Sequence, residues 1–356
     1  MLCSRGLDKC FLKWFFGMFL SLTLSANALA RNDRALRIVI TRGQEQYVIA
    51  PEEFENFMFV SGDQLDITPR VLANRLVKTP DGHRHLMIDE GKAIRLPPKM
   101  EFTSYEGYLV PEHLCLLTGA GVETLGPIGK KHIENYIKYM GVWPETTFLE
   151  IGCGIGRDVF QLLPILGRSG SYIGVDVTRD SITWLQRNVT SVYPNFTFYH
   201  FDAEHEIYNP LGSKKSFDFS LPVPDRSVDR ISIGSVFTHL FEGEVVHYLK
   251  EIKRVLNSDG LAYATFFLYS EEAITASRAK SATPFNLRFE HPYGDGCFVN
   301  DPFYKTGAVA YTHEAILRMI NEAGLRLACP LIRGCWSGLF LDSDDGQDVA
   351  ILEHAP

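Results

Sequence analysis

Short apolar runs alternate with amphipathic stretches along the chain from residue 146 onward. Seven of these runs have strand length: 147–152, 172–177, 196–201, 229–234, 261–267, 325–332 and 348–353. Between them, apolar residues recur at helical spacing over about 157–166, 179–190, 242–256 and 313–323. This alternation predicts right-handed βαβ units, and therefore an α/β domain with a doubly wound, mostly parallel, seven-stranded sheet. The last two strands follow the final helix directly, so one strand is expected to be antiparallel.

Residues 31–100 have a different pattern, with short apolar runs at 35–40 and 46–50 that Gly, Asp and Pro interrupt. The runs predict a small β-rich N-terminal segment. A short helix is expected near 51–57, and the Pro-rich stretch at 96–100 is typical of a linker.

The stretch before the predicted sheet is expected to be helical, because apolar residues recur at helical spacing over about 128–140. We interpret this region as a helical cap that covers the ligand site of the sheet. The predicted organisation is therefore a hydrophobic segment, a β-rich segment, a cap and a large domain, with an insert at about 270–311: residues 1–30, 31–100, 101–145 and 146–356.

Three glycines follow the strand at 147–152 on alternate positions and precede a predicted helix: Gly152, Gly154 and Gly156. Glycine permits a sharp turn and a close approach of a ligand to the backbone. The helix behind the loop offers unpaired N–H groups. For the glycines alone, a tight turn without a ligand is the alternative.

Acidic residues stand at the ends of the first three predicted strands: Glu150, Asp176 and Asp202. In a doubly wound sheet these ends meet at the crevice where nucleotides bind. A carboxylate there is able to accept hydrogen bonds from ribose hydroxyls or from an adenine amino group. A nicotinamide-dependent oxidoreductase is the rival interpretation, but its G-x-G-x-x-G loop requires glycine where Arg157 stands.

Together, E-x-G-x-G-x-G, V-D and F-D-A resemble the class I S-adenosyl-L-methionine (SAM)-dependent methyltransferases. The resemblance continues through LPVPDRSVDRISIGSVFTHL (221–240) and VVHYLKEIKRVLNSDGLAYATFF (245–267) and covers about 127–353. Where the family often has Pro-Gly-Gly, this chain has NSDG at 257–260, in which Gly260 keeps the turn. The resemblance implies a Rossmann-like fold, SAM as cofactor and methyl transfer as the activity.

The resemblance also implies which residues hold the cofactor. The glycines would lie under the methionine and ribose, Glu150 would support the loop and the cofactor amine, and Asp176 would hold the ribose hydroxyls. The remaining implied contacts are with adenine for Val177, Asp202 and Ala203, and with the reacting methyl for Ser235. Ordinary packing is the alternative for Val177 and Ala203.

Methyl transfer depends mainly on alignment of the acceptor, and a base helps when the acceptor is a hydroxyl. His239, just after the fourth strand, is the first candidate base, and His313, before the last predicted helix, is the second. The alternatives are that His239 caps or packs the following helix and that His313 belongs to a helix start at Thr312.

The insert at about 270–311 is dense in aromatic residues, Gly and Pro, and we expect it to lack secondary structure. Connections of this length are usually functional, and aromatic faces with scattered charges suit a sugar ring. The alternative is a loop folded over its own hydrophobic cluster. With SVFTHL and the late G-C-W-S-G and G-Q-D-V-A, the insert resembles a bacterial subgroup, many members of which lie in surface-polysaccharide and natural-product gene clusters.

The predicted acceptor is therefore a hydroxyl of a sugar (a small molecule or a glycan) or of a secondary metabolite. Methylation of an amine, a lipid or a quinone head group stays open, as does a non-catalytic binding protein with this fold. Nucleic acid is not an expected partner, because the formal net charge is −8 and no dense basic run occurs.

Two features of the chain disagree about its location. The uncharged stretch 14–30 follows three basic residues and ends in Ala-Leu-Ala, as in a signal peptide. The seven cysteines, however, are odd in number and irregular in spacing, which predicts neither disulfides nor a zinc site. Free thiols and the implied cofactor favour a cytoplasmic enzyme. Association of this enzyme with the membrane through 14–30 stays open. Export is the alternative.

Overall fold

A computed structural model describes most of the chain from residue 102 onward and short pieces before it. The described residues are 38–42, 45–49, 76–78, 84–89, 92–95, 102–118, 121–205, 207–209, 212–279 and 286–356. The chain divides into two units, Met1–Met100 and Glu101–Pro356, each with its own internal contacts. The predicted segment 14–30, the helix near 51–57 and the linker at 96–100 lie outside the described residues.

The N-terminal unit contains antiparallel strands, as its apolar runs predict. β1 (Ile38–Arg42) pairs with β2 (Glu45–Ile49) in a two-stranded sheet. A second sheet has the order β3-β4-β5, with bounds Leu76–Lys78, Arg84–Asp89 and Lys92–Arg95.

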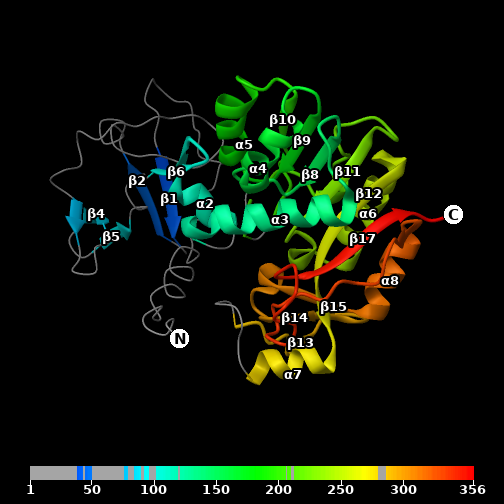
Figure 1. Ribbon diagram of the computed structural model, residues 1–356. Coiled ribbons are helices and arrows are strands. Elements are labelled where there is room, and N and C mark those ends of the chain that lie inside the picture. The colour runs from blue at the N-terminus through cyan, green and yellow to red at the C-terminus, as the bar shows by residue number, and fades with distance from the viewer. Residues whose placement is uncertain are drawn as a thin grey trace, which may run out of the picture. The chain divides into compact units, whose positions relative to one another are not determined.

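A mostly parallel sheet forms the centre of the second unit, in the order β10-β9-β8-β11-β12 (Figure 1). β17 pairs antiparallel with both β12 and β16. The seven strands are β8 (Thr147–Ile151), β9 (Ser171–Asp176), β10 (Phe196–His200), β11 (Val228–Ile233), β12 (Leu256–Tyr269), β16 (Leu325–Leu327) and β17 (Asp348–His354). The predicted fold class is thus confirmed. β16 ends well before the predicted limit at 332, shortly ahead of Pro330, which has no N–H to donate to a sheet.

Helices cover both faces of this sheet (Figure 1). Buried residues of α3, α4 and α5 form one core cluster with one face, and those of α6 and α8 form a second cluster with the other. The helices are α3 (Leu125–Met140), α4 (Arg157–Leu166), α5 (Arg179–Leu185), α6 (Glu242–Val255) and α8 (His313–Glu322). The predicted helix 179–190 continues from α5 as one π-helical turn, Gln186–Thr190.

The predicted helical cap begins with a hairpin and is helical only from Glu112. β6 (Phe102–Tyr105) and β7 (Tyr108–Pro111) pair across Glu106 and Gly107, both at positive φ, which suits a two-residue hairpin turn. Short helices follow before α3: α2 (Glu112–Cys115), η3 (Leu116–Thr118) and η4 (Val122–Thr124).

The expectation that the insert lacks secondary structure is wrong. It contains α7 (Glu271–Ala279), β13 (His291–Pro292), β14 (Cys297–Val299), η8 (Lys305–Gly307) and β15 (Val309–Thr312), while 280–285 lie outside the described residues. β15 pairs with the last residues of β12, and β14 and β13 extend the sheet from there. Part of the insert is buried in a hydrophobic cluster apart from the two main ones, in which Phe289 and Leu287 pack with Phe267 and Trp336.

Within the described parts of the chain, no helix combines the length and the apolarity needed to cross a lipid bilayer.

Candidate active site

The glycine loop after β8 adopts a backbone conformation that side chains rarely permit. Gly152, Gly154 and Gly156 have φ values of 83°, 52° and 91°. A Cβ at Gly152 would lie 2.4 Å from Cγ2 of Val236, and one at Gly156 would lie 2.8 Å from Cδ2 of Leu185. The loop therefore needs glycine for both its dihedral angles and its closeness to neighbouring segments.

Asp176, at the end of β9, joins the glycine loop to the start of α5. One carboxylate oxygen accepts the Gly154 N–H at 2.7 Å. The other accepts the Thr178 N–H at 2.7 Å and the Thr178 hydroxyl at 2.5 Å. The side chain is only partly buried. Since a carboxylate offers about four acceptor positions, Asp176 holds the loop and keeps capacity for a ligand.

Glu150 lies deeper, at the carboxyl end of β8 in the middle of the sheet. Its side chain is buried and accepts a hydrogen bond from the Tyr172 hydroxyl of β9. Burial raises the pKa of Glu150 well above its usual range, and the bond from Tyr172 opposes that rise. Its position suits the support of the loop that the resemblance implies.

After β10, Asp202 and Ala203 close a short loop on itself. Asp202 accepts bonds from the Ser213 hydroxyl at 2.6 Å and the Asn209 amide at 3.1 Å. Burial alone would raise the pKa of Asp202, but these hydrogen bonds hold it below its usual value. Ala203 is buried and bridges to Lys214. Two of the three predicted adenine contacts, Asp202 and Ala203, therefore also shape this loop.

The loop also carries Tyr208, which the sequence analysis does not identify. Its ring lies 5.6 Å from the His239 ring in an edge-on arrangement. Burial, with a smaller contribution from the charge of Asp176, raises the pKa of Tyr208 to about 12. Tyr208 is thus near both Asp176, the predicted ribose contact, and His239, the first candidate base. Val177, by contrast, is partly buried and packs against the hydrophobic core.

Ser235, just beyond β11, is held by two residues from distant parts of the chain. It has φ 57°, rare for a residue with a side chain. Its N–H donates to the Thr265 hydroxyl oxygen at 2.7 Å, and its hydroxyl accepts from the Gln347 amide at 2.9 Å. Thr265 donates in turn to Gln347 at 2.6 Å. Gln347 belongs to the G-Q-D-V-A motif, and this motif is the only feature of the sequence that points to Gln347.

His239 ends η7 (Phe237–His239) and contacts the insert. Its Nδ1 lies 2.8 Å from the Thr306 carbonyl oxygen. Because a carbonyl only accepts, Nδ1 carries the proton and Nε2 of the neutral ring is an acceptor. Burial lowers the pKa of His239 to about 4, although the bond to Thr306 opposes that fall. The ring is therefore neutral at pH 7.

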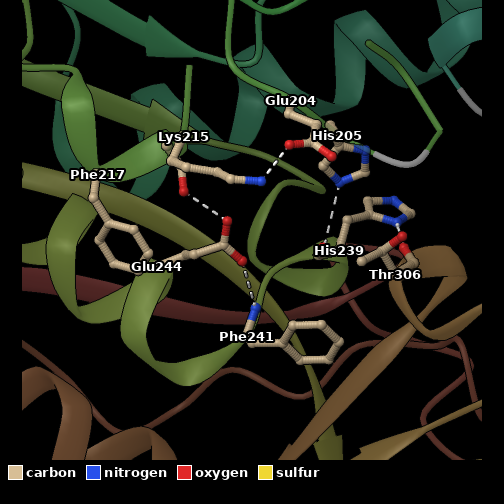
Figure 2. A pocket seen from close by; sticks show the side chains of 9 residues that line it. Glu204, His205, Lys215, Phe217, His239, Phe241, Glu244 and Thr306 are labelled. Atoms are coloured by element: carbon tan, nitrogen blue, oxygen red, sulfur yellow. Dashed lines mark hydrogen bonds and ion pairs between the residues drawn. The ribbon is translucent and has the colours of Figure 1, made fainter. Parts of the chain in front are cut away.

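A cavity of about 540 Å³ opens beside His239 (Figure 2). It is lined by Glu204, His205, Lys215, Ser216, Phe217, His239, Phe241, Glu244 and Thr306. Lys215 pairs with Glu204, and Glu244 accepts the Ser216 hydroxyl at 2.6 Å and the Phe241 N–H at 3.2 Å. Paired charges and two phenyl rings therefore make an amphipathic wall.

His313 does not line this cavity. It is the exposed first residue of α8, and the preceding Thr312 caps the helix by accepting the Ala315 N–H at 3.2 Å. The structure thus brings His239, but not His313, into the cavity.

Comparisons with known proteins bear on the same part of the chain. Residues 148–260 match a family model described as a methyltransferase domain. Among solved structures, a SAM-dependent methyltransferase from Aquifex aeolicus is 17% identical over 62% of this chain and 87% of that one, with a TM-score of 0.37. One from Methanosarcina mazei is 17% identical over 63% and 97%, with a TM-score of 0.40. One from Clostridium acetobutylicum is 12% identical over 68% and 95%, with a TM-score of 0.42.

The matched residues run from β8 into β12 and include the glycine loop, Asp176, Asp202, Ser235 and His239. Beside the glycine loop, the partly exposed carboxylate of Asp176 keeps capacity for a further donor, which fits a hydroxyl of a nucleoside. The match of residues 148–260 to a methyltransferase domain supports SAM as the cofactor.

Proposed function

We propose that the protein transfers the methyl group of SAM to a hydroxyl of a sugar or of a small secondary metabolite. The observation that carries this proposal is the state of His239. Its Nδ1–H is bonded to the Thr306 carbonyl, so that Nε2 keeps a lone pair, and the residue lines a cavity of substrate size. Such a group suits an acceptor that must lose a proton, as a hydroxyl does.

Bound SAM supplies a methyl group on a positively charged sulfur, which is a good leaving group. In our proposal the glycine loop would lie under its methionine and ribose, and Asp176 would accept from a ribose hydroxyl. Glu150 supports the loop from below. Asp202, Ala203 and Val177 surround the adenine, and Ser235 lies beside the methyl position.

The acceptor hydroxyl would lie in the cavity and give its proton to Nε2 of His239 as the new O–C bond forms and the methyl–sulfur bond breaks, leaving S-adenosylhomocysteine. The imidazole would then release the proton to water. An imidazole with a pKa of about 4 is a weak base. Its contribution is therefore a positioned acceptor for the proton, while alignment of the oxygen behind the methyl supplies most of the rate. We rank His239 before His313 because the latter does not line the cavity.

Methylation of an amine is the second candidate, because two carboxylates, Glu204 and Glu244, line the cavity. We rank it lower because Glu204 pairs with Lys215 and Glu244 already accepts two hydrogen bonds. Paired carboxylates attract a cationic ligand less strongly than unpaired ones.

The test is transfer of labelled methyl from SAM by the purified full chain to a panel of acceptors. The panel contains free and nucleotide-linked hexoses, phenolic and aliphatic alcohols, primary amines, and quinols. We expect label on a hydroxyl compound and none on the matched compound whose hydroxyl is already methylated. Label on an amine alone would replace the proposal by the second candidate. SAM binding without transfer to any acceptor would favour a binding protein.

We also propose that the enzyme works in the cytoplasm, where SAM is made, with 14–30 as a membrane contact. Cell fractionation tests this. Mature protein that begins at Arg31 and is found outside the cytoplasm would contradict it.

A further inference from the structure

The short segment that leads from His239 into α6 is attached to the insert at every residue, and His239 and Leu240 make the first two contacts. The imidazole Nδ1–H of His239 donates to the Thr306 carbonyl at 2.8 Å. The hydroxyl of Tyr311, in β15, donates to the Leu240 carbonyl at 2.8 Å. Tyr311 is buried, so its bond is shielded from water.

The next two residues continue the attachment through side chains. The Phe241 ring lies 4.6 Å from the Tyr293 ring of the insert. The Glu242 carboxylate accepts from Arg318 of α8 at 3.1 Å, and Arg318 also donates to the Asp295 carboxylate at 3.1 Å. The residues 239–242 are thus attached to the insert by two hydrogen bonds, a ring contact and an ion-pair bridge.

The insert is itself anchored to the central sheet by packing of its aromatic residues. Phe289 and Trp336 pack on Phe267 of β12, and the Tyr269 and Phe298 rings stack at 3.6 Å. The insert therefore continues the sheet. Its strands β14 and β15 flank Thr306 and fix the position of the Thr306 carbonyl relative to His239.

We propose that the insert is a positioning element for His239. The Thr306 carbonyl selects the Nδ1–H tautomer, and Tyr311 and Tyr293 hold residues 239–242 in register with it. Nε2 is thereby kept as the acceptor in the cavity. This inference rests on the proposed function, in which His239 receives the proton of the acceptor hydroxyl.

Several other polar groups lie around the imidazole. His205 and Tyr208 approach from the loop after β10, with ring centroids 6.4 Å and 5.6 Å from that of His239. Glu204, Lys215 and Glu244 line the same cavity. None of these three belongs to the insert, so a change in the insert alters the His239 contact without removing any of them.

The test uses nitrogen NMR of the histidine rings in the uniformly labelled full chain, which reports tautomer and titration without an acceptor. His239→Gln assigns the signal. In the wild-type protein we expect one tautomer with the proton on Nδ1. Tyr311→Phe and Tyr293→Ala should give mixed tautomers, and entry of water should raise the apparent pKa of His239 by about one unit.

Tyr136→Phe is the matched control, since it removes a buried hydroxyl that bonds to Asp158 between α3 and α4. It should leave the His239 signal unchanged. Calorimetry with SAM shows that each variant is folded. If Tyr311→Phe does not fold, Tyr293→Ala still decides, because the Tyr293 ring is 42% exposed and less important for the core.

A wild-type signal with the proton on Nε2, or variants that keep the wild-type tautomer and titration, would overturn the inference. With a hydroxyl acceptor in hand, kcat of Tyr311→Phe should fall about tenfold at an unchanged KM for SAM. Expected NMR results together with label on amines alone would instead defeat the proposed function, and the positioning of His239 would stand.

Discussion

The two halves of the site are built at very different distances along the chain. In the glycine-loop half, the bond from Gly154 to Asp176 spans 22 positions, one strand–helix–strand unit. In the acceptor half, which comprises the cavity and the contacts of Ser235 at the proposed methyl position, His239 and Thr306 are 67 positions apart, and Ser235 and Gln347 are 112 apart. The cofactor half thus depends on adjacent strands, whereas the acceptor half depends on the insert and the C-terminal segment.

This difference indicates which part of the site binds the cofactor and which part acts on the acceptor. The positive φ angles of the glycine loop and the carboxylate at the end of the next strand arise from local backbone geometry. A site of this kind suits the cofactor, which is the same for every acceptor. The insert builds the acceptor side as an extension of the sheet, and part of it packs on Phe267 of β12 in a cluster apart from the two main cores. We therefore expect substitutions in the first half to impair SAM binding and those in the second to impair turnover.

The largest expected effect is that of Asp176→Ala on the cofactor half. Loss of charge-assisted hydrogen bonds to the ribose and of the bond to Gly154 should weaken SAM binding about 1,000-fold. Calorimetry measures this, and circular dichroism confirms the fold. Asp259→Ala, at an exposed position, is the control. Unchanged affinity in a folded Asp176→Ala protein would disprove the cofactor assignment.

His239→Gln should lower kcat about 100-fold at an unchanged affinity for SAM, because the proton acceptor is lost. In the wild-type protein, kcat should be independent of pH from about 8 to 5 and fall as Nε2 is protonated through the pKa of about 4. A kcat that falls near pH 6.5, the ordinary value, would contradict the buried environment.

The same pKa also makes a prediction for stability. Since the folded-state pKa of His239 lies below that of the unfolded chain, its stabilising contribution is complete above about pH 6.5. It is lost progressively as the pH falls from there towards 4. Urea unfolding of His239→Gln should therefore lose less stability over this interval than the wild type.

Gly152→Ala should reduce the free energy of unfolding by about 3 kcal/mol, because strain at φ 83° adds to the clash with Val236. Gly107→Ala is the matched control, with φ 85° and no atom within 4 Å of the new Cβ. Its cost, about 1 kcal/mol, isolates the strain. The double variant with Val236→Ala should recover part of the difference, and no recovery would show that the clash is unimportant.

The smallest effect is expected from Gln347→Ala, which removes one partner of Ser235 and leaves the other, Thr265. We expect kcat to fall about fivefold with little change in SAM affinity. Steady-state kinetics distinguishes the two. A loss of SAM affinity larger than that of kcat would place Gln347 in the cofactor half instead.

The pattern of apolar residues predicted the central sheet well, because parallel strands and their covering helices bury long, regular faces. The predicted helix 157–166 has the bounds of α4, and the predicted first strand agrees with β8 to one residue. The hairpin at 102–111 and the strands of the insert were missed. They are only two to four residues long, too short for a period to be recognised.

The sequence also indicated the glycines and carboxylates at the strand ends, because each can be recognised from its position directly after an apolar run. It did not identify Tyr208, Thr265, Thr306 or Gln347. Tyr208 lies on an irregular loop, and Thr306 acts through its backbone carbonyl, which any residue possesses. Nothing in the side chain of Thr306 therefore marks its contact with His239.

The order of strands and helices, the glycine loop and the carboxylates at the crevice can thus be read from the sequence. These follow from burial and from backbone restrictions that act between neighbouring residues. The protonation of His239, the contacts that hold Ser235 and the pairing of the insert with the sheet become visible in the folded protein alone. Those properties depend on groups brought together from distant segments, where packing rather than local pattern sets the distance between the partners.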